Sequence, residues 1–101
     1  MDQYILVGKE PQLEPDRFAW ARWYEAGNRV VARTMTNGGV EVSTVFLGLN
    51  HAWGDGPPLL FETALFTEAG SDVVDRYSTW AEAEVGHMEQ VETLDRALAT
   101  A

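Results

Sequence analysis

Two histidines and one glutamate are the residues of this chain whose chemistry could support catalysis or metal binding. His51 and His87 are the only histidines among the 101 residues, and Glu62 lies between them in an apolar segment. An imidazole can transfer a proton near neutral pH or bind a metal ion, and a carboxylate can orient the ring. A small hydrolase or metal-binding protein that uses all three is therefore one function the sequence allows, provided that folding brings them together.

Each of these residues also has a simpler explanation. His87 falls on the apolar side of a predicted helix, where a core histidine with a satisfied hydrogen bond is the commoner role. His51 falls in a predicted loop and could cap backbone carbonyls instead of contacting a ligand. Glu62 could pair with Arg29 or Arg33 on a neighbouring strand. We therefore assign no catalytic residue, no metal site and no cofactor from the sequence.

Motifs that identify common enzymes are missing from the sequence. It contains no Walker loop, no G-x-S-x-G, no H-E-x-x-H, no dinucleotide fingerprint and no EF-hand loop. It also contains no cysteine, which excludes thiol chemistry, disulfides and Cys-based zinc sites. The glycine- and proline-rich run 54–58 precedes a strand instead of a helix, so it predicts a turn and not a phosphate cradle. These absences favour binding over catalysis.

The charge points to a protein partner with a basic surface. Sixteen acidic and seven basic residues give a formal net charge of -9, and eight of the acids but only two arginines lie from Glu68 onward. Such a field opposes direct binding to nucleic-acid phosphates and favours a basic partner. The candidate partner-binding residues are a loop tryptophan with a nearby acid and four acids of the C-terminal segment: Trp53, Asp55, Glu82, Glu89, Glu92 and Asp95.

Both parts of this candidate surface have an alternative role. Trp53 stands among glycine, aspartate and proline residues, so it either anchors a partner or folds inward as a lid over the core. The acidic residues of the C-terminal segment could equally be a solvated helix face with no partner.

The chain is predicted to form a single α+β domain over residues 1–101. The expected order is strand, helix, strand, strand, strand, helix, which gives a small antiparallel sheet of about four strands with both helices on one face. The predicted strands are 4–7, 29–36, 40–47 and 59–66, and the first helix is 16–26. The predicted loops are the segment bracketed by Pro11 and Pro15, then 48–58 and 67–75. The turn Asn37-Gly38-Gly39 between the second and third strands is the strongest hairpin signal.

The C-terminal helix has the clearest predicted start. Thr79 and Glu82 have capping-box spacing, which places the helix start directly after Thr79. Apolar positions then recur every three or four residues, and we expect this stripe to pack on the sheet: Trp80, Ala83, His87, Val91, Leu94 and Leu98. Gly86 in its middle costs about 1 kcal/mol relative to alanine, so we expect a bend there or the close approach of another backbone.

Targeting and membrane segments are not recognisable in the sequence. The N-terminus lacks a basic segment followed by a long apolar run, and no stretch approaches the roughly 18 apolar residues of a membrane span. We therefore expect no membrane interaction and a cytoplasmic location.

Three blocks of the chain resemble a family of short uncharacterised bacteriophage proteins. They are Ser43-Thr44-Val45-Phe46-Leu47-Gly48-Leu49-Asn50-His51, then Gly56-Pro57-Pro58-Leu59-Leu60-Phe61-Glu62-Thr63, then Tyr77-Ser78-Thr79-Trp80 with Gly86-His87. Relatives typically carry Asp before the loop histidine, where this chain has Asn50. The resemblance implies a phage origin and therefore the host cytoplasm as the location.

Small acidic phage proteins often resemble nucleic acid in charge and bind host enzymes that attack the phage genome. By this analogy the resemblance implies a non-enzymatic modulator or inhibitor of a host protein with a basic surface, such as a CRISPR effector complex. A virion or assembly component that acts through self-association, for instance as a homodimer, is a further alternative.

Overall fold

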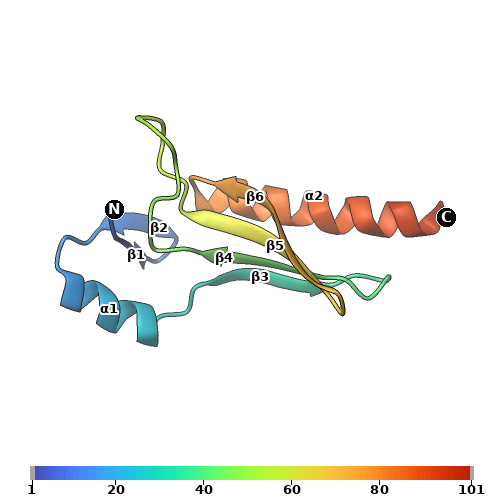
Figure 1. Ribbon diagram of the computed structural model, residues 1–101, viewed down its shortest axis with the longest axis horizontal. Coiled ribbons are helices and arrows are strands. Elements are labelled where there is room, and N and C mark those ends of the chain that lie inside the picture. Colours follow the sequence, from blue (N-terminus) through green and yellow to red (C-terminus); the bar gives the residue numbers. More distant parts are fainter. Residues whose placement is uncertain (1, 101) are drawn as a thin grey trace.

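The protein contains two helices and two antiparallel sheets, so the α+β class with a small antiparallel sheet is confirmed (Figure 1). The computed structural model describes residues 2–100. In chain order the elements are β1 (Tyr4–Val7), β2 (Glu10–Leu13), α1 (Arg17–Ala26), β3 (Val30–Met35), β4 (Glu41–Phe46), β5 (Phe61–Thr67), β6 (Gly70–Tyr77) and α2 (Trp80–Ala99). β1 and β2 form a two-stranded sheet, and β3 to β6 form a four-stranded sheet in sequential order.

Two of these strands, β2 and β6, lie where the sequence predicted loops. Proline lacks a backbone donor and is tolerated in an edge strand, so Pro11 can lie in β2, where it pairs with Leu6. β6 is a solvent-exposed edge strand with polar residues on both faces, so it lacks the apolar alternation of a half-buried strand. The order therefore becomes β-β-α-β-β-β-β-α, and α1 packs on β1 while α2 packs on the four-stranded sheet.

Both helices begin where capping chemistry predicts. Asp16 accepts hydrogen bonds from the backbone N–H groups of Phe18 and Ala19 and so begins α1. At α2 the capping box is complete: Thr79 accepts from the N–H of Glu82, whose carboxylate accepts from the N–H of Thr79. The predicted apolar stripe of α2 is buried at Ala83, His87 and Val91 but is half exposed at Leu98, because the C-terminal end of the helix reaches past the sheet (Figure 1).

The hydrophobic core lies where the two-stranded sheet, the first turn of α2 and one end of the four-stranded sheet meet. Its buried members are Leu6, Phe46, Leu60, Phe61, Tyr77 and Ala83. Phe46 is fully buried, and its ring contacts Phe61 at 5.2 Å and the edge of Trp23 of α1 at 5.7 Å between centroids. Trp80 adds a further edge-to-face contact with Phe61. This cluster joins the N-terminal elements to the larger sheet.

Candidate functional site

His87 lies inside a buried polar network between α2 and the four-stranded sheet. Its Nε2 is 2.9 Å from the Thr34 hydroxyl of β3, and its Nδ1 is 2.8 Å from the Thr44 hydroxyl of β4. Thr44 in turn hydrogen-bonds to Thr63 of β5, and the Tyr77 hydroxyl donates to Thr63 at 3.1 Å. Both ring nitrogens are thus paired, so the simpler interpretation of His87 as a satisfied core histidine is confirmed.

One consistent set of hydrogen-bond directions satisfies this network when the His87 imidazole is neutral, and it forms a continuous run of hydrogen bonds. Tyr77 donates to Thr63, Thr63 to Thr44, Thr44 to Nδ1 of His87, and the Nε2–H of His87 to Thr34. The hydroxyls of Thr63 and Thr44 then each both donate and accept, and hydrogen bonds in such chains strengthen one another. All four strands of the larger sheet and the long helix are held together by this run.

Burial keeps both titratable groups of the network neutral near pH 7. Desolvation lowers the pKa of His87 below the usual 6.5. Desolvation also raises the pKa of Tyr77 above 10.0, an effect opposed by its hydrogen bond to Thr63 and reinforced by the negative charges of Asp75 and Glu89. Both side chains are buried and hydrogen-bonded within the network, so they hold α2 on the sheet and are closed to a substrate in this structure.

The lowered pKa of His87 predicts an acid-sensitive contribution to stability. Below pH 6.5 the unfolded chain binds a proton at this residue more readily than the folded chain does, so the free energy of unfolding falls as the pH drops through the folded-state pKa. Urea unfolding of the wild type and of His87→Gln, above and below pH 6.5, measures this effect. The stability difference between the two proteins should narrow at the lower pH.

The other histidine provides the control for this experiment. His51→Gln removes the loop imidazole and is introduced into both the wild type and the His87→Gln variant. The difference in free energy of unfolding between these two proteins should then be the same as without the His51 substitution. Carboxylate titration affects both proteins and cancels in the difference. A gap between wild type and His87→Gln that is constant from neutral to acidic pH would contradict the prediction.

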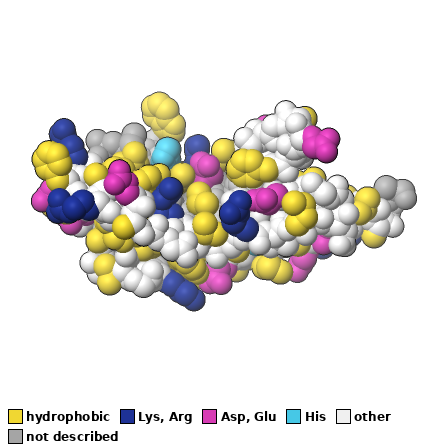
Figure 2. Space-filling view, turned by 90° about the horizontal axis from the view of Figure 1, so that it is seen from below, with side chains coloured by type: hydrophobic (Ala, Val, Ile, Leu, Met, Phe, Trp, Pro, Cys, Tyr) yellow, Lys and Arg dark blue, Asp and Glu magenta, His cyan; other side chains and the backbone are white. Residues whose placement is uncertain are grey.

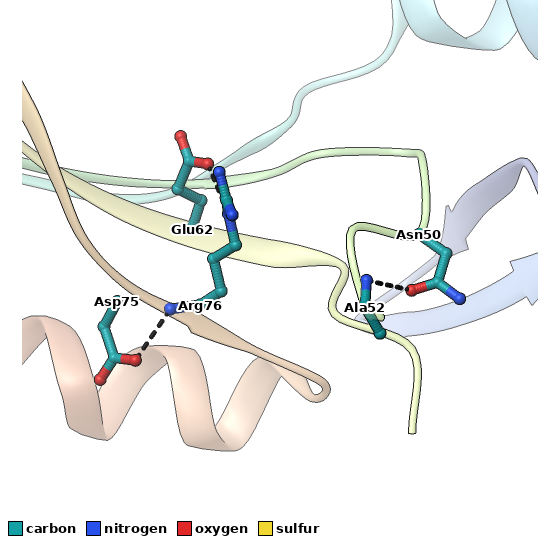
Figure 3. A network of polar contacts seen from close by, with 5 residues as sticks. All are labelled: Asn50, Ala52, Glu62, Asp75 and Arg76. Carbon is teal, nitrogen blue, oxygen red and sulfur yellow. Dashed lines mark hydrogen bonds and ion pairs between the residues drawn. The ribbon is translucent and has the colours of Figure 1, made fainter. Parts of the chain in front are cut away.

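Glu62 lies on the other side of the sheet from His87. Side chains alternate along a strand, and since Thr63 points toward α2, Glu62 points away from it (Figure 3). Its carboxylate pairs with Arg76, its cross-strand neighbour on β6, at 3.1 Å. The predicted pairing with Arg29 or Arg33 is wrong, because the strand that carries Arg76 was predicted to be a loop.

His51 occupies the loop between β4 and β5 and is half-buried. Its backbone N–H donates to the carbonyl of Leu59 at 3.0 Å, which ties the two sides of the loop together. The Asn50 amide oxygen accepts from the N–H groups of Ala52 and Leu59, so this residue closes the base of the loop (Figure 3). Asn50 therefore serves as a structural cap for the loop.

The structure does not bring the three candidate residues together. Within residues 2–100 no hydrogen bond or ion pair joins any two of His51, Glu62 and His87, and no group of three or more acidic or histidine side chains could hold a metal ion. The geometry therefore gives no support to a hydrolase or a metal site built from this trio.

Trp53 projects into solvent at the tip of the same loop, beside the exposed Asp55. Its side chain is 98% exposed, so the alternative that it folds inward as a lid is wrong. The loop extends away from both sheets (Figure 1). A large aromatic side chain held in water by a turn at Gly54 remains available to a partner.

The outward side of α2 carries exposed acids together with exposed apolar side chains. We call this the acidic surface, and its exposed members are Glu82, Glu84, Glu89, Glu92, Val85 and Met88. A shallow groove of about 350 Å³ separates part of it from β6, where Asp75 forms the opposite wall. The residues Glu84, Asp75, Val85 and Met88 of this surface were not predicted from the sequence. A signal for part of it was present, because positions 81, 85, 88 and 92 recur at helical spacing on a side of the helix away from the His87 stripe.

Two of the predicted partner-binding acids have structural roles. The Glu82 carboxylate accepts hydrogen bonds within the α2 capping box. The Asp95 carboxylate is half-buried and accepts from the N–H of Asn37 at 3.0 Å, which fastens the β3–β4 turn to α2. Glu89 and Glu92 make no such contacts within residues 2–100, so they remain the acids most available to a partner.

A second hollow, of about 430 Å³, lies between the β1–β2 hairpin and the start of α2. The Lys9 ammonium lies over the Trp80 ring at 5.6 Å, while Glu10 and Glu84 supply nearby carboxylates. The buried indole N–H of Trp80 has no hydrogen-bond partner within residues 2–100. The volume suits a small ligand, but the mixed charges select no ligand class.

The α+β architecture and these surfaces are the basis for assigning a function. The chain matches no protein-family model, no curated protein and no solved structure. The likeness to short phage proteins therefore stays a prediction from the sequence. Among residues 2–100, none of the helices has the length and apolar content needed to cross a membrane.

Proposed function

We propose that the protein is a non-enzymatic binding protein that docks the acidic surface of α2 on a basic surface of a partner protein. The observation that carries this proposal is the mixture of side chains on that surface. Glu84, Glu89 and Glu92 are exposed beside Val85 and Met88, which are more than half exposed. Apolar area supplies affinity when a partner covers it, and surrounding charge supplies orientation and a fast encounter.

The negative charge of the molecule is not spread evenly, which favours a directed encounter. On the side seen in Figure 2, hydrophobic, acidic and basic side chains are interspersed. On α2, by contrast, the only basic residue is Arg96 near the C-terminal end, against five acids. A basic partner is therefore steered toward α2, and Trp53 on the neighbouring loop offers an aromatic contact that charge alone does not provide.

The partner we propose is a host protein that normally binds nucleic acid, such as a CRISPR effector complex. Such proteins present basic surfaces that recognise phosphate charge, and an acidic face can compete for the same surface. This choice of partner depends on the resemblance to phage proteins and on the formal charge of -9.

Binding to purified CRISPR effector complexes tests the proposal. We expect binding at about 50 mM salt that weakens steeply at about 300 mM, because screening removes the steering field. The double variant Glu89→Gln/Glu92→Gln should weaken binding roughly tenfold. Loading the effector with nucleic acid first should block the interaction, because both ligands need the same basic surface.

A matched variant separates the surface from the total charge. Glu25→Gln/Glu68→Gln removes the same charge from α1 and from the β5–β6 turn, where both residues are exposed, and should bind nearly as well as the wild type. Glu82 is avoided because its loss would also uncap α2. No binding at low salt, or equal weakening by the two double variants, would overturn the proposal.

A further inference from the structure

Within residues 2–100, α2 packs on one face of the four-stranded sheet and no other helix or strand packs over the opposite face. Thr34, Thr44 and Thr63 point toward α2, so the residues that alternate with them point to the opposite side. We call that side the open sheet face. The pairing of the four strands places six apolar residues on it: Val30, Met35, Val45, Ala64, Phe66 and Val73.

These apolar side chains are accessible to solvent. Met35 is 62% exposed, Val73 50% and Phe66 45%, so nothing within residues 2–100 packs over them. On this face Phe66 is the next residue of β5 after Ala64, which pairs with Val73 of β6. Met35 and Phe66 lie on either side of Glu41, which pairs with both of them. Six polar residues share the face with them: Arg33, Glu41, Ser43, Glu62, Ser71 and Arg76. The exposed apolar side chains still form a group around Phe66 and Val73, and such a group is typical of an interaction surface.

The charges on the open sheet face cancel within the face itself. Arg33 pairs with Glu41 at 3.1 Å, and Arg76 pairs with Glu62 at 3.1 Å, and all four side chains lie on this side. The face is therefore neutral on a molecule with a formal net charge of -9. A basic partner gains no electrostatic attraction here, whereas a neutral apolar surface can cover the face without leaving an unpaired charge.

We propose that the open sheet face binds a second copy of this chain, sheet against sheet. The second copy supplies a surface of matching chemistry, because its own face is neutral and presents the same exposed apolar side chains. Face-to-face packing places sheets about 10 Å apart and leaves the two α2 helices on opposite outer sides, roughly 30 Å from each other. That separation exceeds the Debye length of about 8 Å at physiological salt, so the acidic surfaces of the two copies hardly repel each other.

The available area predicts a weak and reversible dimer. Four strands of about six residues cover roughly 400 Å² per copy, about half of what each partner contributes to a standard stable interface. The dimer would expose both acidic surfaces, so it is compatible with the proposed function but does not depend on it.

Sedimentation velocity of the full chain, over a concentration range up to about 1 mM, tests this inference. We expect a monomer–dimer equilibrium that strengthens as salt rises from about 50 to about 500 mM, since screening reduces the repulsion between two acidic chains. Binding of a basic partner through α2 has the opposite salt dependence. The two proposals can therefore fail separately.

Three variants complete the experiment. Phe66→Glu and Val73→Asp each place a charge on the open sheet face and should weaken self-association at least tenfold, with circular dichroism confirming that each variant is folded. Val85→Glu places a charge on the exposed side of α2 and should leave self-association unchanged. A strict monomer at high salt and high concentration, a dimer that survives both sheet variants, or equal weakening by Val85→Glu would overturn the inference.

Discussion

Replacing Phe46 by alanine is expected to lower the free energy of unfolding by about 3–5 kcal/mol, the range for removing a buried aromatic side chain. Phe46 is fully buried at the junction of the two sheets and contacts both Phe61 and Trp23. Its loss leaves a cavity and removes the aromatic contact that joins α1 to β4. We therefore expect α1 to loosen from the sheet in addition to the global loss of stability.

Chemical denaturation and amide hydrogen exchange measure these two effects. The control is Phe18→Ala, which removes a phenyl ring that is largely exposed on α1 and should change stability by less than about 1 kcal/mol. In Phe46→Ala, exchange should accelerate more in α1 than in β5, because β5 keeps its ladder and its contact with α2. Equal destabilisation by the two substitutions would contradict the central position of Phe46 in the core.

Local sequence signals predicted the elements whose structure depends on nearby residues. The capping residues Asp16 and Thr79 mark the starts of both helices, since a cap bonds to backbone groups two or three positions away. The turn around Gly39, which adopts a positive φ of 82°, produces the predicted hairpin of β3 and β4. In each case the determining interaction lies within a few residues of the chain.

Features that depend on a distant partner could not be predicted in this way. β6 is held by pairing with β5, and all of its residues except Tyr77 are exposed, so its sequence lacks the apolar alternation that would have predicted a strand. The partner of Glu62 was missed with it, because Arg76 belongs to that strand. The threonines around His87 come from three strands, and their convergence depends on strand register, for which the sequence offers only the alternation of side chains.

The candidate site changes in character for the same reason. As a histidine, His87 is a residue type that can transfer protons or bind metals. In the structure both of its ring nitrogens are hydrogen-bonded to threonines, and Thr63 and Tyr77 extend the network, so neither nitrogen faces a substrate. The residues that remain available for interaction are those that the fold leaves in solvent, on α2, on the open sheet face and at Trp53.

The second large effect on stability is expected from a substitution at Gly86 of α2. The sequence predicted either a bend of the helix or the close approach of another backbone at this glycine, and the structure shows neither. The helix continues through this position, and the group that approaches it is the Tyr77 side chain instead of another backbone. A Cβ added at Gly86 would overlap the Tyr77 ring and its hydroxyl. Because Tyr77 is buried and hydrogen-bonded to Thr63, its ring has little room to move.

Gly86→Ala is therefore expected to lower the free energy of unfolding by about 2 kcal/mol, since overpacking of about 3 kcal/mol outweighs the roughly 1 kcal/mol by which alanine favours a helix. Urea denaturation measures the change. Gly56→Ala, in a loop with open space around the residue, should alter stability by no more than about 0.5 kcal/mol.

The sign of the effect should reverse once the ring is removed. In a Tyr77→Ala background the obstacle is gone, so Gly86→Ala should raise stability by about 1 kcal/mol through helix propensity alone. The double-mutant cycle then gives a coupling of about 3 kcal/mol between the two positions. If Gly86→Ala destabilised both backgrounds equally, the glycine would be required by the helix itself. A reversal of sign means instead that Gly86 makes room for Tyr77 against α2, which completes the hydrogen-bonded run from Tyr77 through His87 to Thr34.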